Sequence, residues 1–115
     1  MSYTDITSDS VEVFKAVMKK NGVSVVKACA TWCGPCKRIV PAVEKIYLQL
    51  SDDIQVYHID VDECPEIANY LRIRKLPTFT SFVSGDKMDV LESATMGDII
   101  KFFQKVMLRA KVLGK

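Results

Sequence analysis

Short β-branched segments alternate with amphipathic segments along the first half of the chain, and this order constrains the fold more than any other feature of the sequence. Segments of the first kind predict strands at residues 3–7, 23–29, 54–61, 78–83 and 88–92. Segments of the second kind predict helices at 11–20, from 34 to about 50, from 65 to about 71 and from 95 to about 110. The turn Ser84-Gly85-Asp86 joins the last two strands into a hairpin. The order predicts a one-domain α/β protein with a central mixed sheet and helices on both faces.

Local signals indicate where the helices begin and end and which face they bury. Asp9 and Glu12 are three residues apart and predict a capping box for the first helix. Asn21-Gly22 is typical of a left-handed stop at the end of that helix. The final helix is expected to bury one apolar stripe, formed by Ile99, Ile100, Phe103, Val106 and Met107.

The charge balance and the two termini argue against nucleic acid and membrane partners. The 16 basic and 14 acidic side chains give a net charge of +2, and no Lys/Arg cluster lies on a plausible reading element. No apolar run approaches the roughly 20 residues needed to span a bilayer. The segment 1–10 is polar and unlike a secretory signal, and 111–115 is no retention or lipidation motif. These features predict a cytoplasmic protein, in which a close pair of cysteines is catalytic or metal-binding rather than structural.

The segment Trp32-Cys33-Gly34-Pro35-Cys36 carries the chemistry, because it joins a buried strand to a helix. Two intervening residues let the sulfurs meet when Cys33 caps the helix and Cys36 lies in its first turn. The free N–H groups and the positive dipole end of a helix favour thiolate, which is the form that attacks a disulfide. Cys33 is therefore predicted to be the nucleophile and Cys36 the deeper, resolving thiol. Pro35 stiffens the helix start, and Gly34 leaves the nucleophile uncovered.

Structural zinc is the main alternative for a Cys-x-x-Cys pair. It requires two further ligands, and the candidates are Cys29, Cys64 and His58. These residues lack zinc-knuckle spacing, and a proline inside the Cys-x-x-Cys turn is atypical of such sites. We therefore expect no metal and no bound cofactor, only a reversible Cys33–Cys36 disulfide.

Three blocks of the sequence resemble the thioredoxin family. Residues 30–37 (ATWCGPCK) are similar to the active-site stretch of cytosolic thioredoxins, residues 59–64 to the segment after the family's third strand, and Leu76-Pro77-Thr78-Phe79 to its cis-proline loop. The spacing of the blocks also fits, and the similarity covers nearly the whole chain. The resemblance implies a single thioredoxin domain over 1–115, with a mixed five-stranded sheet flanked by four helices.

The resemblance also implies an activity and a set of site residues. The activity is reduction of disulfides in protein substrates, followed by recharging of the dithiol by an NADPH-dependent thioredoxin reductase. Cys33 attacks, Cys36 resolves, and Pro77 is cis beside the dithiol, where the neighbouring backbone pairs with an extended target. The substrate surface is expected to contain Trp32, Gly34, Pro35, Leu76, Pro77 and Ser93.

Lys27 is the main departure from the family, which places a buried Asp six residues before the nucleophile. Three interpretations stay open: the Lys27 stem snorkels to water, a neutral amine accepts the proton of Cys36, or an ammonium lowers the thiol pKa values. His58 occupies the position of the charged partner of that Asp. We hypothesise that Lys27 and His58 together tune the dithiol in place of the acid.

Four further residues differ from the pattern or lie outside it. Ser93 replaces a usual Gly beside the substrate groove, and Lys75 adds positive charge that would favour acidic targets. Cys64 matches an extra cysteine of animal cytosolic thioredoxins, and a partly exposed thiol there is a regulatory candidate that predicts a dimer through Cys64. Cys29 is expected to be a small buried hydrophobe.

Three functions are weighed against these residues. The intact Trp32-to-Cys36 motif favours a general protein-disulfide reductase. A binding module with a thioredoxin fold and a restricted dithiol is the alternative, supported by Lys27 and Ser93. An isomerase or oxidant is disfavoured, because the Gly34-Pro35 dipeptide resembles the reducing type.

Overall fold

A computed structural model describes residues 3–114; Met1, Ser2 and Lys115, at the outer ends of the two terminal segments considered above, lie outside the described residues. A five-stranded sheet has the order β1-β3-β2-β4-β5. The first three strands are parallel, and β4 and β5 are antiparallel to their neighbours, which confirms the mixed sheet. The strands are β1 Thr4–Asp5, β2 Val23–Cys29, β3 Ile54–Asp60, β4 Thr78–Val83 and β5 Asp86–Leu91, and the helices are α1 Val11–Lys20, α2 Gly34–Tyr47, α3 Pro65–Tyr70 and α4 Met96–Leu113.

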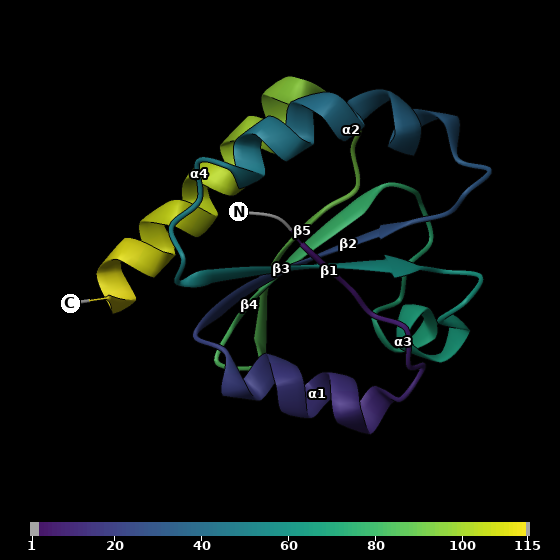
Figure 1. Cartoon of the computed structure of the whole chain (residues 1–115), viewed down its shortest axis with the longest axis horizontal. Helices are drawn as coiled ribbons and strands as arrows, with labels where there is room; N and C mark the ends of the chain where they lie inside the picture. The colour runs from purple at the N-terminus through teal and green to yellow at the C-terminus, as the bar shows by residue number, and fades with distance from the viewer. Residues whose placement is uncertain (1–2, 115) are drawn as a thin grey trace.

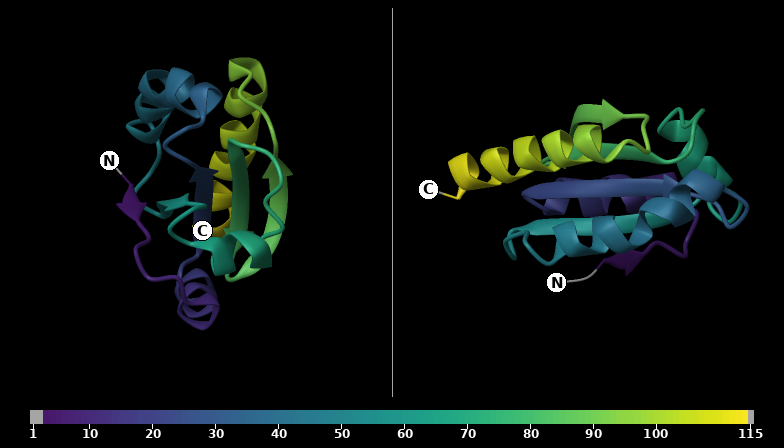
Figure 2. Two further views of the ribbon diagram at one scale, coloured as in Figure 1. Left: turned by 90° about the vertical axis from the view of Figure 1, so that its right-hand side faces the viewer. Right: turned by 90° about the horizontal axis from the view of Figure 1, so that it is seen from above.

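Helices cover both faces of the sheet, as Figure 1 shows with α2 and α4 above it and α1 and α3 below. Alternate residues of the central strand β2 serve the two resulting cores. Val25 packs in the core under α2 and α4, whereas Val26 packs in the core under α1 and α3. Figure 2 shows the same layers from two further directions. The two-sided burial explains why 23–29 is apolar at nearly every position.

The carboxyl ends of the parallel strands meet at one edge of the sheet and define the functional end of the molecule. In register, Cys29 at the end of β2 lies beside Asp60 at the end of β3. Thr78, the first residue of β4, pairs with Ala28 on the other side of β2. This pairing brings the segment that precedes β4, which contains Pro77, next to the chain that leaves β2 for α2.

The caps of α1 differ from the sequence expectation. Ser10, not Asp9, is the N-cap, and its hydroxyl accepts a hydrogen bond from the Val13 N–H at 3.2 Å. The Asp9 carboxylate instead accepts from the N–H groups of Glu66 and Ile67, both at 2.9 Å, and so caps α3. The capping box was wrong because α3 packs beside α1 and supplies free N–H groups that the sequence of α1 cannot reveal.

Two other local expectations were wrong. Asn21 is extended, with φ −81° and ψ 149°, so α1 ends without the left-handed stop. In α4 the buried stripe contains Phe102, which is 7% exposed, whereas Ile100 is 44% exposed and Met107 only packs at the margin of the core. Ile99, Phe103 and Val106 are buried as expected, and Phe102 and Ala110 complete the buried face in place of Ile100 and Met107.

Candidate redox site

A disulfide joins Cys33 and Cys36 at the amino end of α2, with the two Cα atoms 5.3 Å apart. Cys33 is the N-cap residue, and its Sγ accepts a hydrogen bond from the Cys36 N–H at 3.2 Å. Both cysteines are nearly buried, at 4% and 3% exposure. The sulfur of Cys33 therefore occupies the position where a helix stabilises negative charge.

The local chain conformation follows from the residues on either side of the disulfide. The Cys33 N–H donates to the Ala30 carbonyl at 3.1 Å, and the Cys33 carbonyl accepts from Lys37 at 3.3 Å, which starts the helix. Pro35 lies in the first turn, where a missing N–H costs nothing. A Cβ built at Gly34 would meet no atom within 4 Å, so no steric contact requires glycine there.

A small groove lies beside the disulfide and contains two of the expected substrate residues. Its volume is about 190 Å³, and it is lined by Trp32, Val61, Ala68, Ile73, Arg74 and Leu76. Trp32 is 68% exposed, and its indole N–H donates to Asp62 at 2.8 Å. The Leu76–Pro77 peptide bond is cis, as the resemblance implies. Sequence reasoning missed Asp62 and Arg74, although the 59–64 block already pointed to the segment that contains Asp62.

Ser93 makes contacts that the sequence did not indicate. Its hydroxyl donates to Asp98 at 3.0 Å and accepts from the Thr95 N–H at 3.0 Å. Thr95 is the N-cap of α4 but makes no side-chain capping bond. Ser93 therefore supports the start of α4, and it is not among the residues that line the groove.

Lys27 is buried in the middle of the sheet. It is 3% exposed and lies between His58 on β3 and Phe79 on β4. No ion pair joins it to a carboxylate in the part of the chain that the structure describes. Burial lowers its pKa, and the negative charges of Cys29 and Glu44 oppose this only in part. Snorkelling to water is the wrong interpretation, because the side chain is buried, whereas the neutral amine and the ammonium both stay predictions.

His58 is held by two aromatic residues. Its Nε2 and the Tyr47 hydroxyl are 2.8 Å apart, and its ring stacks on Tyr3 with the centroids 3.7 Å apart. Burial, and then the charge of Lys27, lowers the pKa of His58 from 6.5 to about 3. A group with so low a pKa is a poor proton acceptor at neutral pH. The low pKa argues against His58 as the group that takes the proton, and its part in tuning the dithiol together with Lys27 stays a prediction.

The other two cysteines are free thiols in different surroundings. Cys29 is half-buried rather than buried and packs against the cluster of Ala30, Cys33 and Cys36. Cys64 is 0% exposed, and its thiol donates to the Ile6 carbonyl at 3.5 Å. The expectation of a partly exposed Cys64 was wrong, because the start of α3 packs against α1 and the segment that follows β1. In this structure Cys64 presents no thiol surface to a second molecule.

Within residues 3–114 no group of three or more metal-ligating side chains is found. Cys29 and Cys64, two of the three additional ligands considered for zinc, pack in different clusters. None of the described helices combines the length and apolar composition needed to cross a bilayer.

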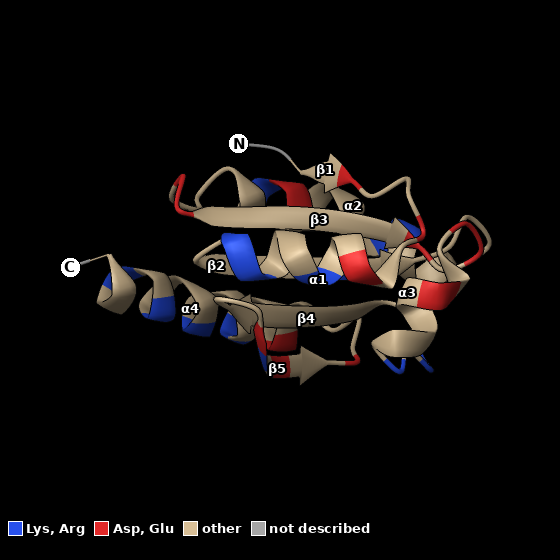
Figure 3. Cartoon of the chain, turned by 90° about the horizontal axis from the view of Figure 1, so that it is seen from below, with Lys and Arg blue, Asp and Glu red and all other residues tan. Residues whose placement is uncertain are grey.

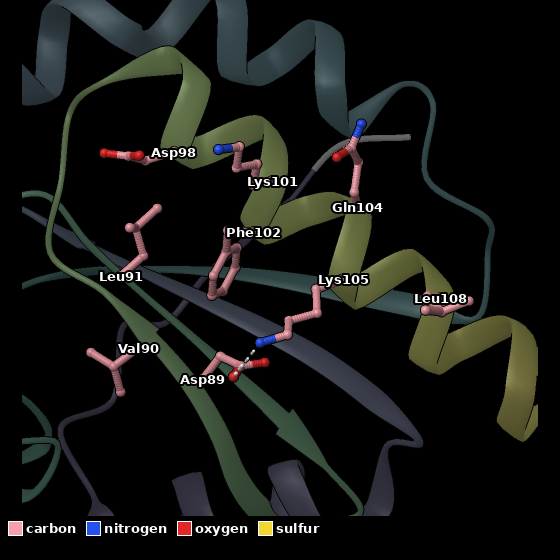
Figure 4. Close-up of a pocket in the computed structure, with 9 residues that line it drawn as sticks. All are labelled: Asp89, Val90, Leu91, Asp98, Lys101, Phe102, Gln104, Lys105 and Leu108. Carbon is pink, nitrogen blue, oxygen red and sulfur yellow. Dashed lines mark hydrogen bonds and ion pairs between the residues drawn. The ribbon is translucent and has the colours of Figure 1, made fainter.

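A larger hollow than this groove lies away from the disulfide. It has a volume of about 510 Å³ and lies between β5 and α4, where Lys105 pairs with Asp89 at 3.5 Å (Figure 4). It holds no cysteine, and each of its two carboxylates is engaged, Asp89 by Lys105 and Arg109 and Asp98 by Ser93. The redox chemistry therefore belongs to the smaller groove.

Comparisons with known proteins agree with this site. The Thioredoxin family model matches residues 5–105. The chain is 43% identical over 86 residues to a thioredoxin of Malassezia sympodialis, covering 74% of this chain and 82% of that one. It is 38% identical over 98 residues to thioredoxin Asp f 29 of Aspergillus fumigatus, covering 82% and 87%. The crystal structure of oxidised mitochondrial thioredoxin 3 from Saccharomyces cerevisiae superposes with a TM-score of 0.80 at 29% identity, covering 90% and 94%.

Proposed function

The chain belongs to the thioredoxin family, and we propose that Cys33 is the nucleophile and Cys36 the resolving thiol of its activity. It is a protein-disulfide reductase, an oxidoreductase with a redox-active disulfide. The observation that carries the assignment of roles is that Cys33 caps α2 and accepts the Cys36 N–H, which favours thiolate at Cys33 once the pair is reduced.

The exchange proceeds in two steps that the geometry accommodates. The Cys33 thiolate attacks one sulfur of the target disulfide, and the other target sulfur leaves as a thiolate that takes up a proton. Cys36 then loses its proton and attacks the Cys33 sulfur, which releases the second target thiol. The target gains two electrons, and the Cys33–Cys36 pair loses two and closes to the disulfide seen here.

Acceleration of insulin disulfide reduction by dithiothreitol tests the reductase activity. We expect strong acceleration by the natural chain and none by Cys33→Ser. Cys36→Ser is expected to accumulate a mixed disulfide with insulin, because the resolving step is blocked. Accumulation with Cys33→Ser instead of Cys36→Ser would reverse the two roles.

The proton that leaves Cys36 is assigned to Lys27. Lys27 lies on the face of the sheet that α2 covers, Cys36 is in the first turn of α2, and burial lowers the pKa of the Lys27 amine, which shifts it in the direction of a proton acceptor. Lys27→Met is expected to slow the resolving step and change its pH profile, whereas Lys27→Asp, which restores a basic group, is expected to recover the rate. Equal profiles for the natural chain and Lys27→Met would show that another group takes the proton.

The partner that recharges the dithiol is proposed to be an NADPH-dependent thioredoxin reductase, in keeping with the family's general need for disulfide substrates and a reductase. The measurement is oxidation of NADPH by a thioredoxin reductase with this chain and insulin present.

We further propose a cytoplasmic location, supported by the two free cysteines, which suit a reducing compartment. Cell fractionation with an antibody to the chain tests the location.

A further inference from the structure

The groove beside the disulfide is lined by α3 and by the segments on either side of it. Val61 precedes α3, Ala68 belongs to it and Ile73 follows it, and all three line the groove. Val61 and Leu76 also pack against the cluster of Ala30, Cys33 and Cys36. The groove and the disulfide therefore share walls, so that a target whose disulfide meets Cys33 extends its neighbouring side chains along α3.

The two ends of α3 carry opposite charges. Asp62 and Glu63 precede the helix and are exposed, and the exposed Arg72, Arg74 and Lys75 follow it. Figure 3 shows acidic residues on the loop beyond β3 and basic residues beyond the far end of α3. Arg74 lines the groove itself, and the other charged residues flank α3, the acidic ones before it and the basic ones after it.

Some of these charges are already engaged, and others are free to meet a target. Asp62 accepts the Trp32 indole N–H, and Arg74 pairs with Glu92 at 3.0 Å. In the described part of the chain, Glu63 and Lys75 form no ion pair. Arg72 likewise forms no ion pair among the described residues, and the Asp62 carboxylate meets only the neutral indole, so unpaired negative charge precedes α3 and unpaired positive charge follows it.

We propose that the groove selects target segments of one charge polarity, with an apolar side chain beside the reacting cysteine, a basic side chain toward Glu63 and an acidic side chain toward Lys75. The proposal rests on the proposed function and names the substrate class of the same site. The apolar lining binds the central side chain, and the two charged ends set the direction in which the segment lies. Because both charges are exposed, we expect a rate difference of about three- to tenfold at low ionic strength, which salt abolishes.

Three short peptides test the inference, each with a central Leu-Cys-Leu whose cysteine is a mixed disulfide with thionitrobenzoate. The first carries lysine before and glutamate after this centre, the second reverses the two, and the third has glutamine at both ends. The rate of thionitrobenzoate release by the reduced protein is measured. The rate with each charged peptide is divided by the rate with the neutral peptide. We expect one charged peptide to react faster than the neutral peptide and the reversed peptide to react more slowly.

A charge-swapped protein, Glu63→Lys with Lys75→Glu, keeps the net charge and is expected to invert the preference. The matched control, Asp53→Lys with Lys111→Glu, swaps exposed charges that line a separate hollow near the end of α4 and is expected to leave the preference unchanged. Turnover of all three peptides at equal rates would overturn the proposed polarity while the reductase activity stands. Failure to turn over even the neutral peptide would refute both.

Discussion

Two cysteines of this chain begin a helix and are followed closely by proline, yet only one of them is in the disulfide. Cys33 is the N-cap of α2, and Cys64 is the N-cap of α3. At α2 the Cys33 sulfur accepts a helix N–H itself. At α3 the cysteine makes no capping bond, and the Asp9 carboxylate takes the N–H groups of Glu66 and Ile67. A helix N-terminus activates a thiol only when the sulfur is the group that receives its N–H groups.

The surroundings of the two thiols differ as well. Burial, followed by the charge of Asp9, raises the pKa of Cys64 and favours the neutral thiol. The sheet face under α3 is apolar at Val26, Ala28 and Ile59. The face under α2 contains Lys27 and His58 instead, two titratable groups whose pKa values are both lowered by burial. The titratable side chains Lys27 and His58 therefore lie on the face next to the dithiol, whereas Ser24 and Thr80, which are buried on the other face, carry no charge.

The largest expected difference between Cys33 and Cys64 is in the rate of insulin disulfide reduction. Cys33→Ser is expected to reduce insulin reduction to the uncatalysed rate of dithiothreitol alone, because no other thiol of the described chain caps a helix and accepts its N–H groups. Cys64→Ala is expected to leave turnover unchanged, since Cys64 is fully buried and its thiol is engaged by Ile6. A similar loss of turnover in the two variants would contradict the proposed difference between Cys33 and Cys64.

A smaller effect is expected from removing the Asp9 carboxylate, which accepts the N–H groups of α3 in place of the Cys64 sulfur. Asp9→Ala leaves two N–H groups of α3 without their acceptor, and we expect a loss of about 1–2 kcal/mol in the free energy of unfolding. Removing the negative charge is also expected to lower the pKa of Cys64, seen as a shift of its alkylation midpoint to lower pH. Urea unfolding and the pH dependence of alkylation measure the two effects.

Ser10→Ala is the matched control for Asp9→Ala, because it removes the exposed cap of α1 but no charge near Cys64. It is expected to cost stability, by about 0.5–2 kcal/mol, without moving the alkylation midpoint of Cys64. If both variants moved the midpoint equally, the shift would come from general loosening of the fold, and Asp9 would have no specific influence on the thiol.

The dithiol was predictable from the sequence, whereas the surroundings of Cys64 were not, because the first is local and the second is built by tertiary contacts. Cys33 and Cys36 are three residues apart, and the strand and helix that hold them follow directly in the chain. The burial of Cys64 depends on Ile6, and the cap of its helix depends on Asp9, which is more than 50 residues away. The choice between Ser10 and Asp9 as the cap of α1 depended on the same contact.

Lys27 illustrates an intermediate case. The sequence placed a lysine in an apolar strand and left three interpretations open. Burial excluded the first of them, snorkelling to water, because Lys27 is 3% exposed between Phe79 and His58. The Tyr47 and Tyr3 contacts that immobilise His58 join α2 and the start of the chain to β3, and no spacing within β3 could have indicated them.

The smallest effect is confined to acidic pH and concerns His58. Its pKa is about 3 in the folded protein and 6.5 ordinarily, so between these values the unfolded chain binds a proton that the folded chain does not. Stability contributed by the neutral imidazole is therefore complete above about pH 6.5 and is lost as the pH falls toward 3. We expect the natural chain to lose more stability than His58→Gln between about pH 7 and about pH 4.5, measured by urea unfolding.

The alkylation midpoint of Cys64 is expected to be the same in both proteins, because His58 and Cys64 lie in different parts of the core. An equal loss of stability in the two proteins would mean that His58 binds its proton in the folded state as readily as in the unfolded state. The contacts with Tyr47 and Tyr3 would then not lower the pKa of His58.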